Sequence, residues 1–131
     1  MATILVIEDN MLNMELATDL LVMAGHDVLQ AYTAEKGLTI AEEHRPDLVL
    51  LDIRLPGMDG YAAVKLLKSG APTRAIPVVA LTAEAMKGDR ENALAAGFDE
   101  HLSKPLDVRT FGRTVDELLQ RFGRGARTDG Q

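Results

Sequence analysis

The sequence predicts an α/β fold built around a parallel sheet. Three short apolar runs, ILVI (4–7), LVLL (48–51) and VVAL (78–81), lack the alternation of apolar and polar residues that a half-exposed strand shows. Unbroken runs of this kind are typical of central parallel strands that helices cover on both faces. A stretch with helical spacing follows each run, which indicates repeated β–α units. We therefore expect a single domain of five β–α units in these 131 residues.

The order of elements follows from local signals along the chain. Strands are expected near residues 3–7, 27–31, 48–51, 77–81 and 98–102. Helices are expected near residues 11–24, 34–44, 60–69, 84–96 and 107–122. The second and fifth strands (VLQA and FDEHL) are more polar than the other three, so we place them at the edges of the sheet.

Several helix ends carry recognisable signals. Thr33, Asp59 and Asp107 precede helical patterns, where each side chain can cap backbone N–H groups. Gly25 and Gly97 follow helical stretches, where a left-handed residue costs glycine little. These signals support the predicted bounds of the helices.

The last predicted helix has the clearest apolar stripe. Its members recur at i, i+3 and i+4 spacing: Val108, Phe111, Val115, Leu118, Leu119 and Phe122. The segment GRGARTDGQ that follows has no apolar anchor. We therefore expect a folded domain over residues 1–122 and a disordered tail over 123–131.

Composition narrows the classes of function. The formal net charge of −6 argues against nucleic acid as a partner. The absence of cysteine excludes a disulfide framework, a thiolate metal site and a cysteine nucleophile. The first apolar run is short and meets two acids at once, so it is neither a signal peptide nor a membrane span. We expect a cytoplasmic protein without nucleic-acid or membrane partners.

Polar side chains stand at the ends of four predicted strands. Glu8 and Asp9 follow the first, Asp52 the third and Thr82 the fourth, while Lys104 lies just beyond the fifth. In a parallel sheet, ligands bind beyond the carboxyl ends of the strands, so these groups should converge. Carboxylates this close repel one another unless a cation lies among them, and Mg²⁺ prefers oxygen ligands. The pattern predicts a site for magnesium-assisted phosphorylation of an aspartate.

Each of these residues has an ordinary explanation when taken alone. An acidic pair after a strand suits a helix N-terminus, and an aspartate before LPG suits a turn. Thr82 can cap the next helix, and Lys104 can be a solvated lysine. The coincidence of all four features at one edge of one sheet is what indicates a functional site.

Four motifs together identify a family. EDN (8–10), PDLVLLDIRLPGMDG (46–60), IPVVALTA (76–83) and LSKP (102–105) resemble the receiver domain of bacterial two-component response regulators. The resemblance extends from about Thr3 to Phe122 and is strongest to single-domain cell-division regulators of the DivK type, through EDNMLNMEL, DIRLPGMDG and AEAMKGD. It implies a flavodoxin-like sheet of order 2-1-3-4-5 flanked by five helices.

The resemblance implies a role for each acidic residue. Asp52 would be the nucleophile that accepts a phosphoryl group from the phosphohistidine of a histidine kinase or a histidine phosphotransfer protein. Asp9, Asp52 and the backbone carbonyl of Arg54 would ligate Mg²⁺, and Glu8 would hold a metal-bound water. The family is a phosphoacceptor signalling module rather than a free-standing enzyme.

The resemblance also implies roles for residues near the fourth and fifth strands. Lys104 would neutralise phosphoryl oxygens, and Thr82 would hydrogen-bond one of them after transfer. His101 occupies the position where most of the family has a switch tyrosine or phenylalanine, so it is either the switch residue or an exposed histidine on an edge strand. Lys104 and Pro105 match the family's cis peptide.

The resemblance implies that the signal passes to another protein through a surface of the domain. In the family, the responsive face comprises the fourth helix, the fifth strand and the fifth helix. Here it would include Glu84, Lys87, Glu91, Glu100, His101 and Arg113. We expect a downstream protein target on this face, a monomer or weak dimer, and a role in cell-cycle or cell-division control.

Three other functions are alternatives to this one. An aspartyl-phosphate hydrolase needs an acid–base aspartate two residues after the nucleophile, where Arg54 stands. A nucleotide or flavin binder needs glycine in the first loop, which reads EDNMLN. A degenerate receiver that acts as a phosphorylation-independent scaffold stays the alternative.

Arg54 and Glu84 occupy the two positions that tune phosphate hydrolysis in the family.

Overall fold

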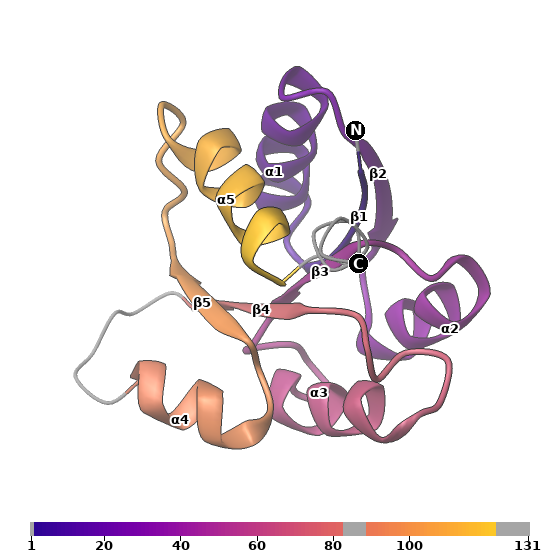
Figure 1. Ribbon diagram of the computed structural model, residues 1–131. Helices are drawn as coiled ribbons and strands as arrows, with labels where there is room; N and C mark the ends of the chain where they lie inside the picture. Colours follow the sequence, from indigo (N-terminus) through magenta and orange to yellow (C-terminus); the bar gives the residue numbers. More distant parts are fainter. Residues whose placement is uncertain (1, 83–88, 123–131) are drawn as a thin grey trace.

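The computed structural model describes residues 2–82 and 89–122. A parallel sheet forms the central layer, and helices cover both of its faces (Figure 1). The strand order is β2-β1-β3-β4-β5, and each neighbouring pair is parallel. The expected fold class, strand order and edge positions of the two polar strands are confirmed.

The elements alternate along the chain as predicted. The strands are β1 Thr3–Ile7, β2 Asp27–Ala31, β3 Leu48–Asp52, β4 Val78–Thr82 and β5 Glu100–Ser103. The helices are α1 Met11–Met23, α2 Ala34–His44, α3 Gly60–Ser69, α4 Asp89–Ala96 and α5 Phe111–Phe122. The predicted start of the fourth helix (84–88) and the predicted tail (123–131) lie outside the described residues.

Two apolar clusters, one on each face of the sheet, explain the unbroken apolar runs. In β1, Ile4 and Val6 belong to the cluster that contains residues of α1 and α5. Leu5 and Ile7 belong to the cluster that contains residues of α2, α3 and α4. Successive side chains of a strand point to opposite faces, so a strand covered on both faces needs an apolar residue at every position.

The last helix begins later than predicted, at Phe111 instead of residue 107. The Asp107 carboxylate accepts the N–H of Arg109, and the Asp107 carbonyl accepts the N–H groups of Thr110 and Phe111. Asp107 therefore caps a turn that leads into the helix, because its short side chain competes for nearby backbone donors. Val108, a member of the predicted apolar stripe, is exposed.

The other helix-end signals are confirmed. Thr33 accepts the N–H of Lys36 at 3.1 Å, and Asp59 accepts the N–H of Ala62 at 2.9 Å. Gly97 has a φ of +117°, in the left-handed region that glycine tolerates. These caps fix where α2 and α3 begin and where α4 ends.

Gly60 should be required for close packing at the end of β3. A Cβ at this position would lie 2.6 Å from the Ile53 Cα and 2.8 Å from the Asp52 carbonyl oxygen, and backbone atoms cannot move aside cheaply. We expect Gly60→Ala to lower the free energy of unfolding by about 1–3 kcal/mol, as overpacking does. Urea unfolding would measure the change.

Gly112→Ala is the matched control, because it also adds a methyl group to a helical glycine. There the added Cβ meets only the Ala24 Cβ, at 3.2 Å. Equal stability of the two variants would contradict the packing role of Gly60.

Candidate functional site

The predicted site residues meet at the carboxyl edge of the sheet because of strand register. Ile7 of β1 is paired with Leu51 of β3, so Glu8 and Asp52, the next residues of each strand, are neighbours. Asp52 is paired with Leu81 of β4, and Thr82 with Ser103 of β5, next to Lys104. Parallel pairing therefore converts four separate strand ends into one cluster.

Lys104 joins the two buried acids. Its ammonium donates to Glu8 Oε1 at 2.6 Å and to Asp52 Oδ2 at 2.9 Å. The Glu8 side chain is 2% exposed and the Asp52 side chain 7%. Charged groups this well removed from water need partners, and one cation serves both carboxylates.

Backbone N–H groups hold the second oxygen of each acid. Asn10 N–H donates to Glu8 Oε2 at 3.0 Å, and Arg54 N–H donates to Asp52 Oδ1 at 2.9 Å. Both carboxylates are therefore fixed from two sides. The sequence had not indicated the contribution of Asn10; its role as N-cap of α1 is the signal that places its backbone beside Glu8.

Burial and pairing shift the ionisation of this cluster. Burial raises the pKa of the Glu8 carboxyl, and the nearby Asp52 charge adds to this, whereas Lys104 and Asn10 act against it. Burial would lower the pKa of the Lys104 ammonium, but its bonds to Glu8 and Asp52 outweigh this and the pKa is raised. Lys104 is thus held as a cation at the centre of the site.

The acids also form a candidate metal site. Glu8, Asp9 and Asp52 each offer a carboxylate oxygen, and these oxygens lie within 4.8 Å of one another. Asp9 is exposed while the other two are buried, so the group opens to solvent on one side. An all-oxygen set with room for water fits the chemistry of Mg²⁺.

The remaining predicted site residues lie at different distances from this cluster. The Thr82 side chain is buried, and the Thr82 carbonyl accepts the N–H of Lys104 at 2.7 Å. Arg54 is exposed and contacts Asp52 through its backbone. His101 lies further back on β5, paired with Ala80, and its side chain is 19% exposed. The expected cis bond between Lys104 and Pro105 is present.

Comparison with known proteins shows the family of this chain. A model of the response regulator receiver domain matches residues 4–116. The chain belongs to the response regulator receiver domain family. It is therefore a receiver-domain signalling module, as the motifs had indicated.

Two relatives show which type of response regulator the chain resembles. The polar-differentiation response regulator DivK of Brucella anthropi is 41% identical over 117 residues, covering 89% of this chain and 95% of DivK. DivK of Brucella ovis is 40% identical with the same coverage. The match to DivK-type regulators is confirmed.

Solved structures share the fold. The receiver domain of a sensor histidine kinase from Pseudomonas aeruginosa, with a magnesium ion coordinated in its active-site cleft, is 36% identical, with a TM-score of 0.80 over 92% of this chain and 96% of that one. The chemotaxis response regulator CheY4 of Vibrio cholerae is 26% identical, with a TM-score of 0.85 over 91% and 99%. In the described ranges, none of the helices has the length and apolar character to cross a membrane.

Removing the Lys104 charge should leave two buried carboxylates without their cation. We expect Lys104→Met, which keeps the apolar stem, to lower the free energy of unfolding by about 2–4 kcal/mol, as breaking a buried ion pair does. The loss should be smaller when Lys104→Met is made in a Glu8→Gln background, because less uncompensated charge then stays buried. Denaturant unfolding of the wild type, the two single variants and the double variant would measure it.

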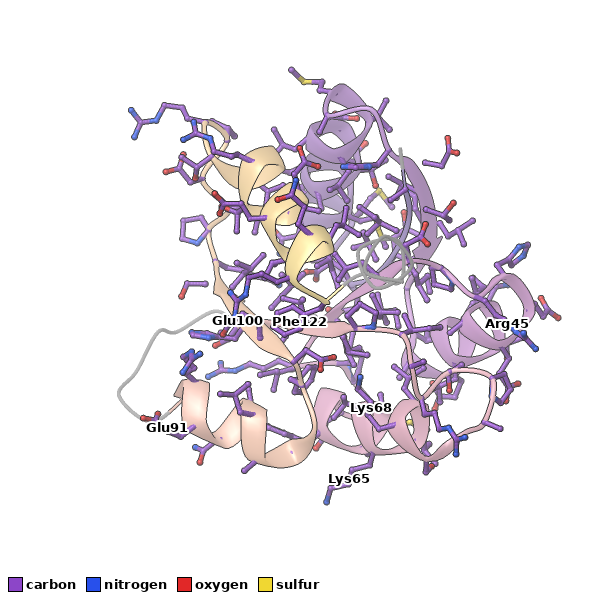
Figure 2. All side chains as sticks on the ribbon, in the orientation of Figure 1. Arg45, Lys65, Lys68, Glu91, Glu100 and Phe122 are labelled. Atoms are coloured by element: carbon purple, nitrogen blue, oxygen red, sulfur yellow. The ribbon has the colours of Figure 1, made fainter. Side chains whose placement is uncertain are left out.

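Lys65→Met is the control, because Lys65 of α3 is exposed and extends away from the protein (Figure 2). Strictly additive effects of the Glu8 and Lys104 substitutions would contradict the proposed coupling.

Proposed function

We propose that this protein is a DivK-like response regulator that accepts a phosphoryl group on Asp52 from the phosphohistidine of a histidine kinase or phosphotransfer protein. The observation that carries the proposal is the arrangement of Asp52, which lies buried between two other acids and one lysine ammonium. A nucleophilic carboxylate, oxygen ligands for a divalent cation and a cation for phosphoryl oxygens are together what phosphotransfer needs.

The transfer step is a substitution at phosphorus. A carboxylate oxygen of Asp52 forms the new P–O bond, and the P–N bond to the donor histidine breaks. The electron pair of that bond stays on the imidazole nitrogen, and the product is an acyl phosphate. The Arg54 N–H, which donates to Asp52 Oδ1, holds the carboxylate in a fixed orientation.

The surrounding residues supply charge and position. Glu8, Asp9, Asp52 and the carbonyl of Arg54 are the groups that would hold Mg²⁺, with Glu8 acting through water. When bound, the metal would neutralise phosphoryl oxygens and the charge of the acids. Lys104, which bonds to Asp52 Oδ2 before transfer, can then pair with a phosphoryl oxygen instead.

The signal would leave through Thr82, His101 and the face formed by α4, β5 and α5. The Thr82 hydroxyl would turn to a phosphoryl oxygen, and the His101 ring would adjust its burial in response. A two-state change of this kind alters which protein partner binds. We further propose a monomer or weak dimer in the cytoplasm, with a role in cell-cycle or cell-division control. The DivK relatives are named as polar-differentiation response regulators, which is compatible with such a role. Glu84 and Lys87 of the expected face lie outside the described residues.

Substitution of the nucleophile tests the assignment directly. We expect Asp52→Asn to abolish incorporation of acid-labile phosphate from acetyl phosphate with Mg²⁺, because an amide does not form the acyl phosphate. Asp9→Asn should mainly weaken Mg²⁺ binding, measured by titration calorimetry. The matched control is Asp19→Asn, on the exposed face of α1. Labelling of Asp52→Asn at the wild-type rate would show that the site assignment is wrong, whereas a wild-type protein that takes up no phosphate would favour the scaffold alternative.

Arg54 should affect phosphate lifetime more than stability. Its side chain is exposed, so Arg54→Ala should change the free energy of unfolding by no more than about 0.5 kcal/mol. A side chain beside the phosphoryl group can hinder or orient attacking water, so the half-life of the acyl phosphate should change several-fold. Phosphate release and thermal unfolding, measured on the same variant, decide the matter. A shifted midpoint with an unchanged half-life would refute the role.

A further inference from the structure

Glu100, the first residue of β5, is reached by arginines from two helices. Arg90 of α4 donates through Nε to Glu100 Oε1 at 3.0 Å and through Nη2 to Oε2 at 3.4 Å. Arg121 of α5 places Nη1 3.7 Å from Oε2. The His101 N–H also donates to Oε1, at 3.1 Å. One carboxylate therefore contacts all three elements of the expected output face.

The two arginines approach from different layers of the protein. Ala93 of α4 belongs to the apolar cluster on one face of the sheet, and Phe111 of α5 to the cluster on the other. Figure 1 shows α4 and α5 on either side of β5, and Glu100 is labelled at this strand in Figure 2. Because β5 is an edge strand, an acid there can bridge both layers around the edge of the sheet.

Burial differs sharply between the acid and its partners. The Glu100 side chain is 13% exposed, whereas Arg90 is 55% exposed and Arg121 58%. The carboxylate is therefore the fixed point, and the long arginines are the parts that can move away. The shorter contacts belong to Arg90, so Glu100 holds α4 more firmly than it holds α5.

The His101 ring faces the same carboxylate. Its Nδ1 is buried, lies 3.6 Å from Glu100 Oε1 and has no hydrogen-bond partner in the described part of the chain. A ring nitrogen that carries a hydrogen is attracted to the carboxylate, whereas a bare lone pair is repelled. The position of the residue proposed as the switch thus depends on the charge of Glu100.

We propose that Glu100 is an electrostatic clasp, which holds α4 and α5 against β5 in the unphosphorylated arrangement and opposes the rearrangement of this face. This is the unphosphorylated arrangement, because the Lys104 ammonium binds Asp52 Oδ2. After phosphorylation, the ammonium would bind a phosphoryl oxygen instead. The claim that the clasp opposes the rearrangement rests on the proposed function. The claim that Glu100 holds α4 and α5 against β5 is independent of it.

Glu100→Gln in the full chain tests the clasp without any phosphorylation. It keeps the shape of the side chain and removes the charge. Amide hydrogen exchange should become several-fold faster in α4, less so in α5, and stay unchanged in α1. The Nδ1-protonated share of neutral His101, measured by ¹⁵N NMR, should fall. Arg109→Ala is the control, because the Arg109–Asp107 pair is exposed and outside the clasp. Unchanged exchange in α4 would overturn the proposal.

The pH dependence of stability gives a second readout. Burial would raise the pKa of the Glu100 carboxyl, but hydrogen bonds from Arg90 and His101 outweigh it and hold the pKa below its ordinary value of 4.5. Besides these groups, Arg121 and Glu117 of α5 line the adjoining groove of about 560 Å³. The stabilisation from Glu100 is fully present above its unfolded pKa and is lost as the pH falls through the lowered value. The stability difference between wild type and Glu100→Gln should shrink accordingly in acid.

Titration with beryllium fluoride and Mg²⁺ tests whether the clasp opposes the rearrangement. If the clasp opposes the rearrangement, Glu100→Gln should respond at a concentration about 3- to 10-fold lower than wild type, followed by the chemical shifts of α4 and β5. Faster exchange in α4 with a wild-type titration curve would make the clasp purely structural and overturn its regulatory role. A wild-type chain without any response would refute the proposed function and the regulatory role together, while hydrogen exchange would still decide the clasp.

Discussion

The ion pairs of Lys104 with Glu8 and Asp52 are the contacts on which the rest of this structure depends. The two acids lie almost wholly out of water, where a carboxylate without a partner is costly. Their cation comes from the end of β5, so β1, β3 and β5 must keep their register for the charges to be balanced. The loops beyond the strands are then tied down by Asn10 N–H, Arg54 N–H and the close approach of Gly60.

Buried charge of this kind is a poor way to stabilise a fold. A well-packed apolar residue at Glu8 or Lys104 would avoid the cost of removing charges from water. The proposed function gives a reason to keep them, since phosphotransfer needs acids and a cation in one place. The two apolar clusters of the sheet, which consist of hydrophobic residues, offset the cost of burying these charges.

The site and the proposed output face are connected through a short piece of β5. The Lys104 N–H binds the Thr82 carbonyl at one end of this strand, and Glu100 gathers Arg90 and Arg121 at the other. His101 lies between them, with its ring directed at the Glu100 carboxylate. The strand β5, which has four residues, is therefore where two changes meet. One is a change in the partner of Lys104, and the other is a change in the contacts of Glu100. An edge strand suits this purpose, because one side of it has no neighbouring strand to restrain it.

By itself, the sequence determined the alternation of elements, the class of sheet and the residues of the candidate site. Apolar runs, caps such as Thr33 and polar strand ends are local features, and each acts within a few residues. Only the tertiary structure decided that Lys104 bonds to both acids, one of them 96 residues away, and that Arg90 and Arg121 share Glu100. It also moved the start of α5 to Phe111, because Asp107 uses nearby N–H groups for a turn. Such contacts depend on register and on the directions of side chains across a folded sheet, which local spacing does not encode.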